Sequence, residues 1–528
     1  MNHGTLRRGK LSFGASALAF ILGLACLPRA ATAACGYPLM GSTNYDGPWS
    51  GQDEARAIAI DSTGNPVVAG FEANVMGDDD WRITVYDKSL GSVLHTATYN
   101  GPYGNGNDYA YAVAVDASGN IVVAGVELGV ASDLNWRVRK YNPALSVMMA
   151  STDYDGPQAS SADTAWGVAA DPSGNIVVVG TEKSPSGGKQ WRVQKYNPTL
   201  STILSSTTYN GLGSGLNHAY AVAIDPIGGS VYVAGSYNAG ASGQDWMVRK
   251  YDNTLSTVLA EFSRNGSGNL NDEASAIAIA SNGDVVIAGY ELGTSYGWQV
   301  YRTDSGLTNP PPYGATYALA TTETKATAVA LDYAGNVIVG GYEGNGGQDW
   351  RVIKYDPTLA SMISSTKYGG AGNQSDYVRG VAVDSSGSIY VAGSEYATVS
   401  QINWRVRKYG GTQVCVEDQS AAPGPTAASL RSGQIRLAPN TLSASADGRI
   451  AIVLKGQPSG SPEVTVYDAA DRVVDRFTVQ LGGDGTAIQT WEAKYRSGGR
   501  LAPGVYWIRA SGGGADDRKA FIVSPRRR

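Results

Sequence analysis

The chain has 528 residues, and its 41 Lys and Arg residues against 46 Asp and Glu residues give a formal net charge of −5. Gly is abundant at 68 residues, only 16% of residues are charged, and Tyr (31) and Trp (11) outnumber Phe (6); this composition is typical of short strands joined by tight turns, not of coiled coils. Three Cys residues exclude a disulfide-dense miniprotein, 42% apolar content excludes a disordered chain, and the length predicts two or more domains.

The first 33 residues have the features of a secretory signal peptide. A basic stretch with Arg7, Arg8 and Lys10 precedes an apolar run over residues 11–27, and Ala31-Thr32-Ala33 offers a small-residue cleavage site. The run is too short and too rich in Gly and Ser for a membrane span. We therefore expect Sec-type export of a protein that is extracellular or at the cell surface.

Charge is divided unevenly along the chain. Residues 34–416 hold 22 basic and 35 acidic residues, a net charge of −13, whereas residues 417–528 hold 15 and 11, a net charge of +4. An acidic main domain repels nucleic-acid phosphates. The sequence therefore argues against a nucleic-acid partner.

Residues 34–416 contain a long internal repeat. Trp recurs at positions 81, 136, 191, 246, 298, 350 and 404, each time within a unit of four strand-sized segments. The second unit contains them as YAVAVD, IVVAG, NWRVRKY and STDY, with a tight ASGN turn between the first two. Four strands in about 50 residues are typical of a β-propeller blade, so seven units predict an all-β, seven-bladed propeller.

The seventh unit lacks a fourth strand, and the mature N-terminus supplies a matching segment. Residues 42–47 (STNYDG) resemble the fourth-strand end at residues 207–211 (TTYNG), so they should complete the last blade. Cys35 lies ten residues before Tyr45, and Cys415 lies six after Tyr409, which places both cysteines in the same interrupted turn. In an oxidising compartment this predicts a Cys35–Cys415 disulfide; two free thiols are the alternative.

The repeat resembles a known family. The pattern A-V-A-V-D-x-S-G-N-I-V-V-A-G followed by W-R-V-x-K-Y is similar to the bacterial SBBP-type β-propeller repeat over about residues 38–410. The resemblance implies an exported propeller and supplies no catalytic residues. Repeat 5 departs most from the pattern, because Ala280 replaces the turn Asp and residues 306–312 replace the usual approach to the fourth strand. We expect an irregular blade there.

A linker over residues 417–433, rich in Pro, Ala, Gly and Ser, precedes a second domain over residues 434–528. Short alternating segments such as residues 464–467 (VTVY) predict a small β-sandwich. With the element Pro503-Gly-Val-Tyr, the domain is similar to the Ig-like domain of flagellar-hook capping proteins and to the C-terminal sorting domain of type IX secretion. The resemblance implies either contact with secretion machinery or the cell surface, or a passive appendage.

The loops between second and third strands diverge among the repeats, whereas the turns at the opposite end are nearly uniform. Divergent loops on a repeated scaffold are where binding sites form, so we expect a ligand on that face. Beside these loops, Glu follows the Ala-Gly pair in six blades and Arg follows the Trp in five; blade 4 loses both. Structural ion pairs are the expected explanation, and paired glycosidase carboxylates are the alternative.

Five aspartates precede the inner strand by an equal offset: Asp53, Asp108, Asp163, Asp272 and Asp376. Asn217 and Thr324 hold this position in the other two blades. One interpretation is a side chain at the start of the strand that bonds local backbone. The other is a ring of carboxylates at the channel mouth that holds a cation, with Ca²⁺ as the candidate.

Three residues further on, the inner strands diverge. Blades 2–4 carry Tyr111, Trp166 and Tyr220, and blades 7 and 1, adjacent around the ring, carry Arg379 and Arg56. Aromatic stacking on one side and bidentate guanidinium contacts on the other suit a carbohydrate or an anionic ligand. Packing between blades is the alternative.

Catalytic motifs are scarce. After signal cleavage the only histidines are His95 and His218, and the sequence contains no G-x-S-x-G, no H-E-x-x-H and no zinc-type Cys/His cluster. We assign no catalytic residue and no cofactor. The expected function is a non-catalytic scaffold that binds an extracellular carbohydrate or protein; a propeller lyase or hydrolase that uses His218 at the channel mouth is the alternative.

Overall fold

The computed structural model describes residues 35–524 except 50, 105, 130–132, 159–160, 213–214, 241–242, 267, 269, 294–295, 320–322, 345–346, 371–373, 399–400, 411–413, 416–434, 439–440, 444–448, 456–460, 469–471, 482–485, 493–500, 502–503 and 513–514. The predicted signal peptide and the predicted linker at 417–433 lie outside this range. The described residues are all-β: they form 38 strands and no α-helix.

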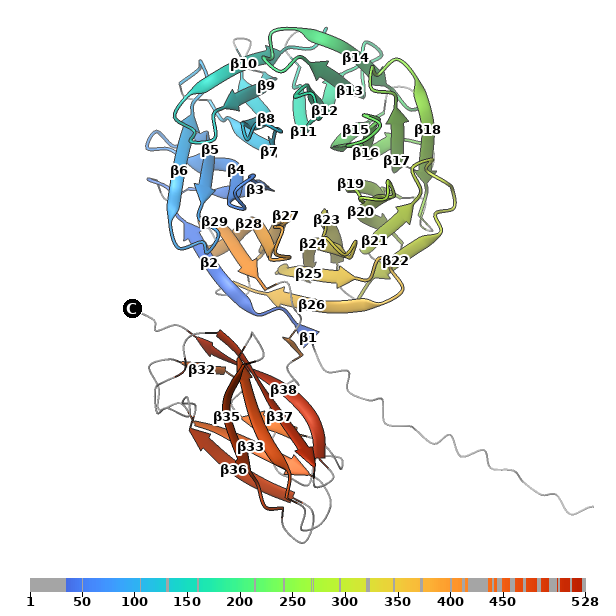
Figure 1. Ribbon diagram of the computed structural model, residues 1–528. Helices are drawn as coiled ribbons and strands as arrows, with labels where there is room; N and C mark the ends of the chain where they lie inside the picture. Colours follow the sequence, from blue (N-terminus) through green and yellow to red (C-terminus); the bar gives the residue numbers. More distant parts are fainter. Residues whose placement is uncertain are drawn as a thin grey trace, which may run out of the picture. The chain divides into compact units, whose positions relative to one another are not determined.

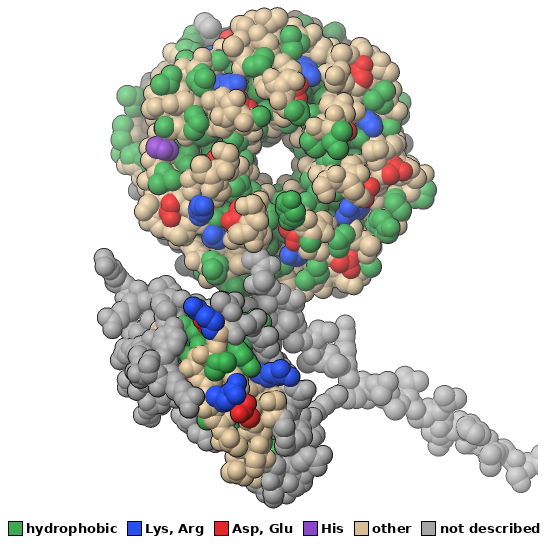
Figure 2. All heavy atoms as spheres, in the orientation of Figure 1, with side chains coloured by type: hydrophobic (Ala, Val, Ile, Leu, Met, Phe, Trp, Pro, Cys, Tyr) green, Lys and Arg blue, Asp and Glu red, His purple; other side chains and the backbone are tan. Residues whose placement is uncertain are grey.

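Within residues 39–409, four-stranded antiparallel sheets follow one another along the chain, and seven of them are present among the described residues. Figure 1 shows them arranged in a ring, with one edge strand of each sheet innermost, and Figure 2 shows an open channel through the centre. This is the arrangement of β-propeller blades. We number the blades along the chain from the sheet that begins at Glu54.

Blade 1 contains β3 (Glu54–Ile60), β4 (Pro66–Ala73), β5 (Asp79–Tyr86) and β6 (Val93–Tyr99); blade 2 contains β7 (Tyr109–Val115), β8 (Ile121–Leu128), β9 (Leu134–Tyr141) and β10 (Met148–Tyr154); and blade 3 contains β11 (Thr164–Ala170), β12 (Ile176–Lys183), β13 (Lys189–Tyr196) and β14 (Ile203–Tyr209). Blade 4 contains β15 (His218–Ile224), β16 (Val231–Asn238), β17 (Gln244–Tyr251) and β18 (Val258–Arg264), and blade 5 contains β19 (Glu273–Ile279), β20 (Val285–Leu292), β21 (Tyr296–Thr303) and β22 (Tyr313–Tyr317). Blade 6 contains β23 (Glu323–Leu331), β24 (Val337–Gly344), β25 (Asp349–Tyr355) and β26 (Met362–Tyr368), and blade 7 contains β27 (Tyr377–Val383), β28 (Ile389–Thr398), β29 (Gln401–Tyr409) and β2 (Leu39–Tyr45). In blade 5 the fourth strand, β22, has only five residues, in line with the irregularity expected there.

The core lies between the blades. Each cluster of buried apolar side chains combines two successive blades; Trp136 of blade 2, for example, packs with Ile176 and Val178 of blade 3. Six of the repeat Trp side chains also donate an Nε1–H hydrogen bond of 2.8–3.2 Å to a backbone carbonyl of the next blade. The Trp repeat therefore marks the side chain that joins one blade to the next.

The N-terminal segment closes the ring, as the sequence predicts. β2 pairs with β29 in the register Tyr45↔Trp404, and a buried cluster joins Trp404 of blade 7 to Ala55 and Val68 of blade 1. Before β2, the short strand β1 (Cys35–Gly36) pairs with β30 (Val414–Cys415).

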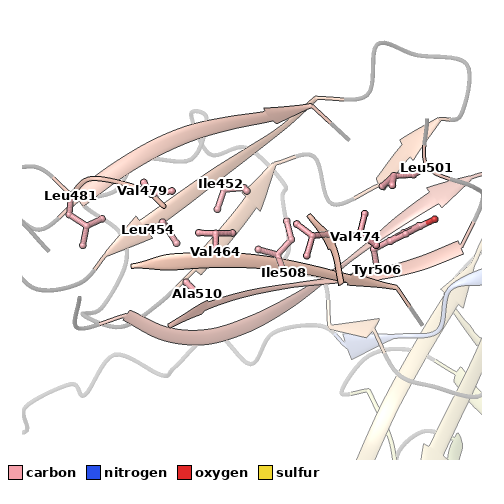
Figure 3. Close-up of a cluster of buried hydrophobic side chains, with 11 residues drawn as sticks. Ile452, Leu454, Val464, Val474, Val479, Leu481, Leu501, Tyr506, Ile508 and Ala510 are labelled. Atoms are coloured by element: carbon pink, nitrogen blue, oxygen red, sulfur yellow. The ribbon is translucent and has the colours of Figure 1, made fainter. Parts of the chain in front are cut away.

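The C-terminal residues form two sheets around a separate core. One sheet contains β31 (Ile435–Ala438), β33 (Arg449–Lys455) and β36 (Thr486–Glu492); the other contains β32 (Thr441–Ser443), β34 (Glu463–Asp468), β35 (Val473–Thr478), β37 (Gly504–Gly512) and β38 (Ala515–Ser524). Ile452 and Leu454 from the first sheet meet Val464 and Ile508 from the second in one buried cluster (Figure 3). The alternation seen in the sequence thus corresponds to two sheets that share a hydrophobic core.

Candidate functional site

The divergent inner-strand position is a β-bulge in every blade. In blade 3, Ala165 pairs with Gly180 and Gly167 pairs with Val179, so Trp166 between them has no partner in the ladder. The same register shift occurs at the equivalent position of the other six blades. A bulge leaves one residue outside the pairing and re-aims its side chain. The positions that vary most are therefore those that strand pairing constrains least.

The Gly of the repeated Ala-Gly pair makes room for this bulge. A Cβ at Gly180 would overlap the carbonyl oxygen of Thr164. The same overlap recurs at the equivalent glycines Gly70, Gly125, Gly235, Gly289, Gly341 and Gly393. The repeated Gly is thus required by close backbone approach, not by its conformational freedom.

Blades 2–4 contribute a continuous row of rings, which we call the aromatic arc (Tyr109, Tyr111, Trp166, His218 and Tyr220). Ring centroids lie 4.5 Å apart for Tyr111 and Trp166, and 6.0 Å apart for Trp166 and Tyr220. Tyr109 stacks on Tyr111, and His218 stacks on Tyr220 with an interplanar angle of 11°. All five side chains are half-buried, so the arc keeps part of its surface accessible.

Blades 7 and 1 contribute a charged cluster (Glu54, Arg56 and Arg379). The Glu54 carboxylate bridges both guanidinium groups, at 2.6 Å from Arg56 Nη2 and 2.6 Å from Arg379 Nε. Burial alone would raise the pKa of Glu54, but the two guanidinium groups hold it below its usual value. The two Arg side chains remain 26% and 29% exposed, so both guanidinium groups keep accessible surface. A second carboxylate, Asp79, accepts a hydrogen bond of 3.0 Å from Tyr109 and interacts electrostatically with Arg56.

The five predicted ligand residues are brought together, side by side. The Arg56 guanidinium lies 5.6 Å from the centre of the Tyr111 ring, so the charged cluster continues directly into the aromatic arc. The order around the channel is Arg379, Arg56, Tyr111, Trp166 and Tyr220. Aromatic and cationic groups therefore form one continuous band, not two opposite walls.

Sequence analysis missed a second divergent position, two residues before the bulge. It holds Glu54, Tyr109, Thr164, His218, Glu273, Lys325 and Tyr377 in successive blades. The signal was available, since these residues differ from blade to blade as much as the bulge residues do. One of them, Glu273, is contacted by Ser275 and Tyr290, and burial raises its pKa.

His218 is tied to the arc by a short polar chain. Its Nδ1 lies 3.2 Å from the Thr181 hydroxyl oxygen, which also accepts a hydrogen bond of 3.2 Å from Trp166 Nε1. Burial, and secondly the charge of Lys189, lowers the pKa of His218 to about 4. The imidazole is therefore neutral at neutral pH.

A surface cavity of about 250 Å³ lies beside this part of the arc. Its lining comes from the loops of blades 3 and 4 and includes Lys183, Lys189, Ser161 and Leu216. Two ammonium groups in a hollow of this size suit a small anionic or sugar-like group.

The five aspartates before the inner strands are buried, 0–1% exposed, and are bonded to backbone. Asp163 accepts hydrogen bonds from the N–H groups of Gly156 at 2.5 Å and Lys183 at 3.2 Å. The same pair of backbone donors reaches Asp53, Asp108, Asp272 and Asp376. These contacts support the first interpretation, a side chain that bonds local backbone at the start of the strand, over a cation ring at the channel mouth.

The expected Glu–Arg ion pairs are confirmed. Glu72 and Arg82 lie 2.7 Å apart, and the equivalent pairs form in blades 2, 3, 6 and 7. A Tyr hydroxyl from the preceding blade donates to the same Glu, as Tyr45 does to Glu72 at 2.5 Å. The pairs therefore strengthen the contact between blades.

Comparison with known proteins supports the repeat. The model of a family described as SBBP, beta-propeller repeat, matches residues 366–394, which span the end of β26 through most of β28. No curated protein matches the chain.

Solved structures that match the chain include PorZ, an essential surface component of the type-IX secretion system of Porphyromonas gingivalis. It is 15% identical with a TM-score of 0.44, and the match covers 91% of this chain and 60% of PorZ. A protein of unknown function from Dyadobacter fermentans is 10% identical with a TM-score of 0.43 (71% of this chain, 99% of that chain). Quinohemoprotein alcohol dehydrogenase from Comamonas testosteroni is 10% identical with a TM-score of 0.42 (73% and 78%).

No group of three or more His, Cys, Asp or Glu side chains in the described residues is arranged to hold a metal ion. In the same part of the chain no helix is long and apolar enough to cross a membrane.

Proposed function

We propose that the mature chain is an exported, seven-bladed β-propeller with an Ig-like C-terminal sandwich, and that it binds a carbohydrate or an anionic ligand without chemical turnover. The signal-like segment at residues 1–33 supports export. The continuous band formed by the charged cluster and the aromatic arc supports the ligand class. Of these two observations, the band is the one on which the proposed ligand binding depends.

The inner strands of the ring depart from the repeat at one position. Seven blades around one axis pack alike, so residues at their inner strands repeat unless something at the channel lacks that symmetry. The residues of the band differ from blade to blade on one side of the ring, and those at the bulge have no partner in strand pairing. Half-buried rings offer a flat apolar surface for a sugar ring, and the Arg side chains offer paired donors for a carboxylate or sulfate.

A glycan array with acidic and neutral oligosaccharides tests this proposal on the full exported chain. We expect retention of an acidic oligosaccharide whose structure is unchanged after incubation. Failure of every oligosaccharide and every small organic acid to bind would refute the proposed ligand class.

A lyase is the second candidate, and the observation that favours it is the linkage of His218 to Tyr220 and Thr181. A neutral imidazole beside a phenol is a pair able to move a proton. Release of unsaturated products from an array ligand, abolished by His218→Ala, would favour the lyase over the binding scaffold.

For the C-terminal domain we propose a role in contact with secretion machinery or the cell surface. Its two-sheet core supports a folded module separate from the ring. Cell fractionation tests the role: the full chain should stay with the cell surface, and a chain that ends at residue 433 should be released or retained inside. Equal distribution of the two chains would indicate a passive appendage.

A further inference from the structure

Two buried carboxylates lie in the divergent loops without a partner. Asp78 of blade 1 and Asp133 of blade 2 are 7% and 8% exposed. Neither oxygen of either side chain has a hydrogen-bond partner in the described part of the chain. Both residues stand three positions before the repeat Trp, so the two sites are equivalent.

Each carboxylate has a second oxygen close by. Asp80 in β5 and Asn135 in β9 follow two residues later, and each has a buried, unpartnered Oδ1. In blade 2 both side chains lie beside Gly129: a Cβ there would overlap Asn135 Nδ2 and lie 3.1 Å from Asp133 Oδ1. The backbone of each loop is held by one bond across its base, Asn74 N–H to Asp78 O at 2.8 Å and Gly129 N–H to Asp133 O at 2.7 Å.

The surroundings do not neutralise these charges. Asp155 has a pKa raised by burial and then by the carboxylates of Asp133 and Asp153. The two arginines nearest in sequence, Arg82 and Arg137, are bonded to Glu72 and Glu127. An ionised carboxylate that is buried without a partner costs several kcal/mol, so a counter-ion at these loops would be strongly favoured.

We propose that the loops of blades 1 and 2 each bind a Ca²⁺ ion through Asp78 with Asp80 and Asp133 with Asn135. All four donors are hard oxygens, and Ca²⁺ accepts irregular sets of oxygen ligands more readily than Mg²⁺. Backbone carbonyls and water complete the coordination. With two side-chain ligands per ion, the affinity belongs to the weak extracellular range, a Kd of about 10⁻⁴–10⁻³ M.

The other blades have no carboxylate three residues before the Trp. Gly188, Gly243 and Gly347 hold this position in blades 3, 4 and 6, and Ser295 and Gln401 hold it in blades 5 and 7. The sites also differ from the five strand-start aspartates, whose oxygens accept backbone hydrogen bonds. They lie on the divergent face, where the ions would stiffen two ligand-facing loops.

Calcium titration of the full exported chain, first stripped with a chelator, tests the proposal. By calorimetry and equilibrium dialysis we expect about two Ca²⁺ per chain, with a higher Tm in CaCl2 than in MgCl2. Asp78→Asn and Asp133→Asn should each lose about one ion. Without calcium they should melt at or above the temperature of the wild type, because each removes an uncompensated buried charge.

The matched control is Asp163→Asn, which neutralises a buried carboxylate whose oxygens are already bonded, and should keep both ions. The proposal is overturned if the wild type binds no Ca²⁺ at about ten times the expected Kd range. It is equally overturned if Asp78→Asn and Asp133→Asn retain the wild-type stoichiometry.

Discussion

At the scale of single residues, the aspartates at the start of the inner strands connect each blade to the loop before it. Blade 4 shows what that connection needs, because Asn217 replaces the Asp there. Its Oδ1 accepts from the N–H groups of Gly211 and Asn238, and its Nδ2 donates to Lys189 O at 2.7 Å. Asp and Asn at this position therefore both accept two backbone hydrogen bonds, and the connection does not require the negative charge of Asp.

Removing the charge at Asp163 should reduce the dependence of the protein's stability on pH. Burial raises the pKa of Asp163 to about 6 from 3.8, although two backbone N–H groups lower it. The folded state therefore binds the proton of Asp163 more tightly than the unfolded state does. The resulting gain in the free energy of unfolding is complete below pH 3.8 and is lost as the pH rises through about 6. Thermal melts at pH 5 and pH 7.5 should differ less for Asp163→Asn than for the wild type. The reciprocal Asn217→Asp should widen the difference; identical pH profiles for all three proteins would contradict this.

Removing the side chain is a different test of the same residue. Asp163→Ala leaves the N–H groups of Gly156 and Lys183 without their acceptor inside the protein. Each unsatisfied buried group costs about 1–3 kcal/mol, so chemical denaturation should show a clear loss in the free energy of unfolding. A loss no greater than that of Asp163→Asn would mean that water replaces the carboxylate.

At the scale of strands, the bulge decides which side chains reach the channel. Gly180, which pairs with Ala165 next to the bulge, has no room for a Cβ, because the Thr164 carbonyl occupies the space. Gly180→Ala should therefore distort β11 and lower the free energy of unfolding by about 1–3 kcal/mol, the range for overpacking. Gly104→Ala is the control, since a Cβ there meets nothing within 4 Å. Equal melting of the two variants would show that the bulge adapts.

The N-terminal strand pair makes the predicted disulfide testable. β1 and β30 align Cys35 directly opposite Cys415. Opposed residues of antiparallel strands have Cα atoms about 4.5–5.5 Å apart, within the range of disulfides. Intact mass before and after reduction with alkylation should reveal one disulfide, and Cys415→Ser should lower the Tm by loosening blade 7. Two alkylatable thiols in the native exported protein would rule the bond out.

The strands also show which structural features the sequence pattern predicts and which it does not. Period-2 alternation and the Trp spacing predict the four strands of each blade, and the match between residues 42–47 and 207–211 predicts the closing strand. Alternation does not reveal the bulge, because Ala recurs at every second position on both sides of it, as Ala110, Ala112 and Ala114 do in blade 2; only the repeated Gly indicates it. Of the residues two positions before the bulge, the sequence drew attention only to His218; others, such as Glu54 and Tyr109, were missed because their position has no common residue type.

At the scale of the whole ring, the repeated residues stabilise the packing between blades, whereas the residues of the channel wall differ from one blade to the next. Blades 2–4 present the aromatic arc, while blades 7 and 1 present the charged cluster. Buried clusters between successive blades hold both in place without using their exposed surfaces. A ligand without sevenfold symmetry can therefore meet aromatic and cationic groups at once.

The affinity of Trp166→Ala for the oligosaccharide selected on the array tests the central claim most directly. Calorimetry should show binding weakened by about 1–3 kcal/mol, the range for an anchoring aromatic side chain. The exposed Trp49, outside the arc, is the matched control, and Trp49→Ala should bind as the wild type does. Trp166→Ala should also melt well above Trp136→Ala, whose ring is fully buried between blades. If Trp166→Ala binds like the wild type, or melts as early as Trp136→Ala while no ligand stabilises either, then Trp166 serves packing between blades and the channel is not the binding site.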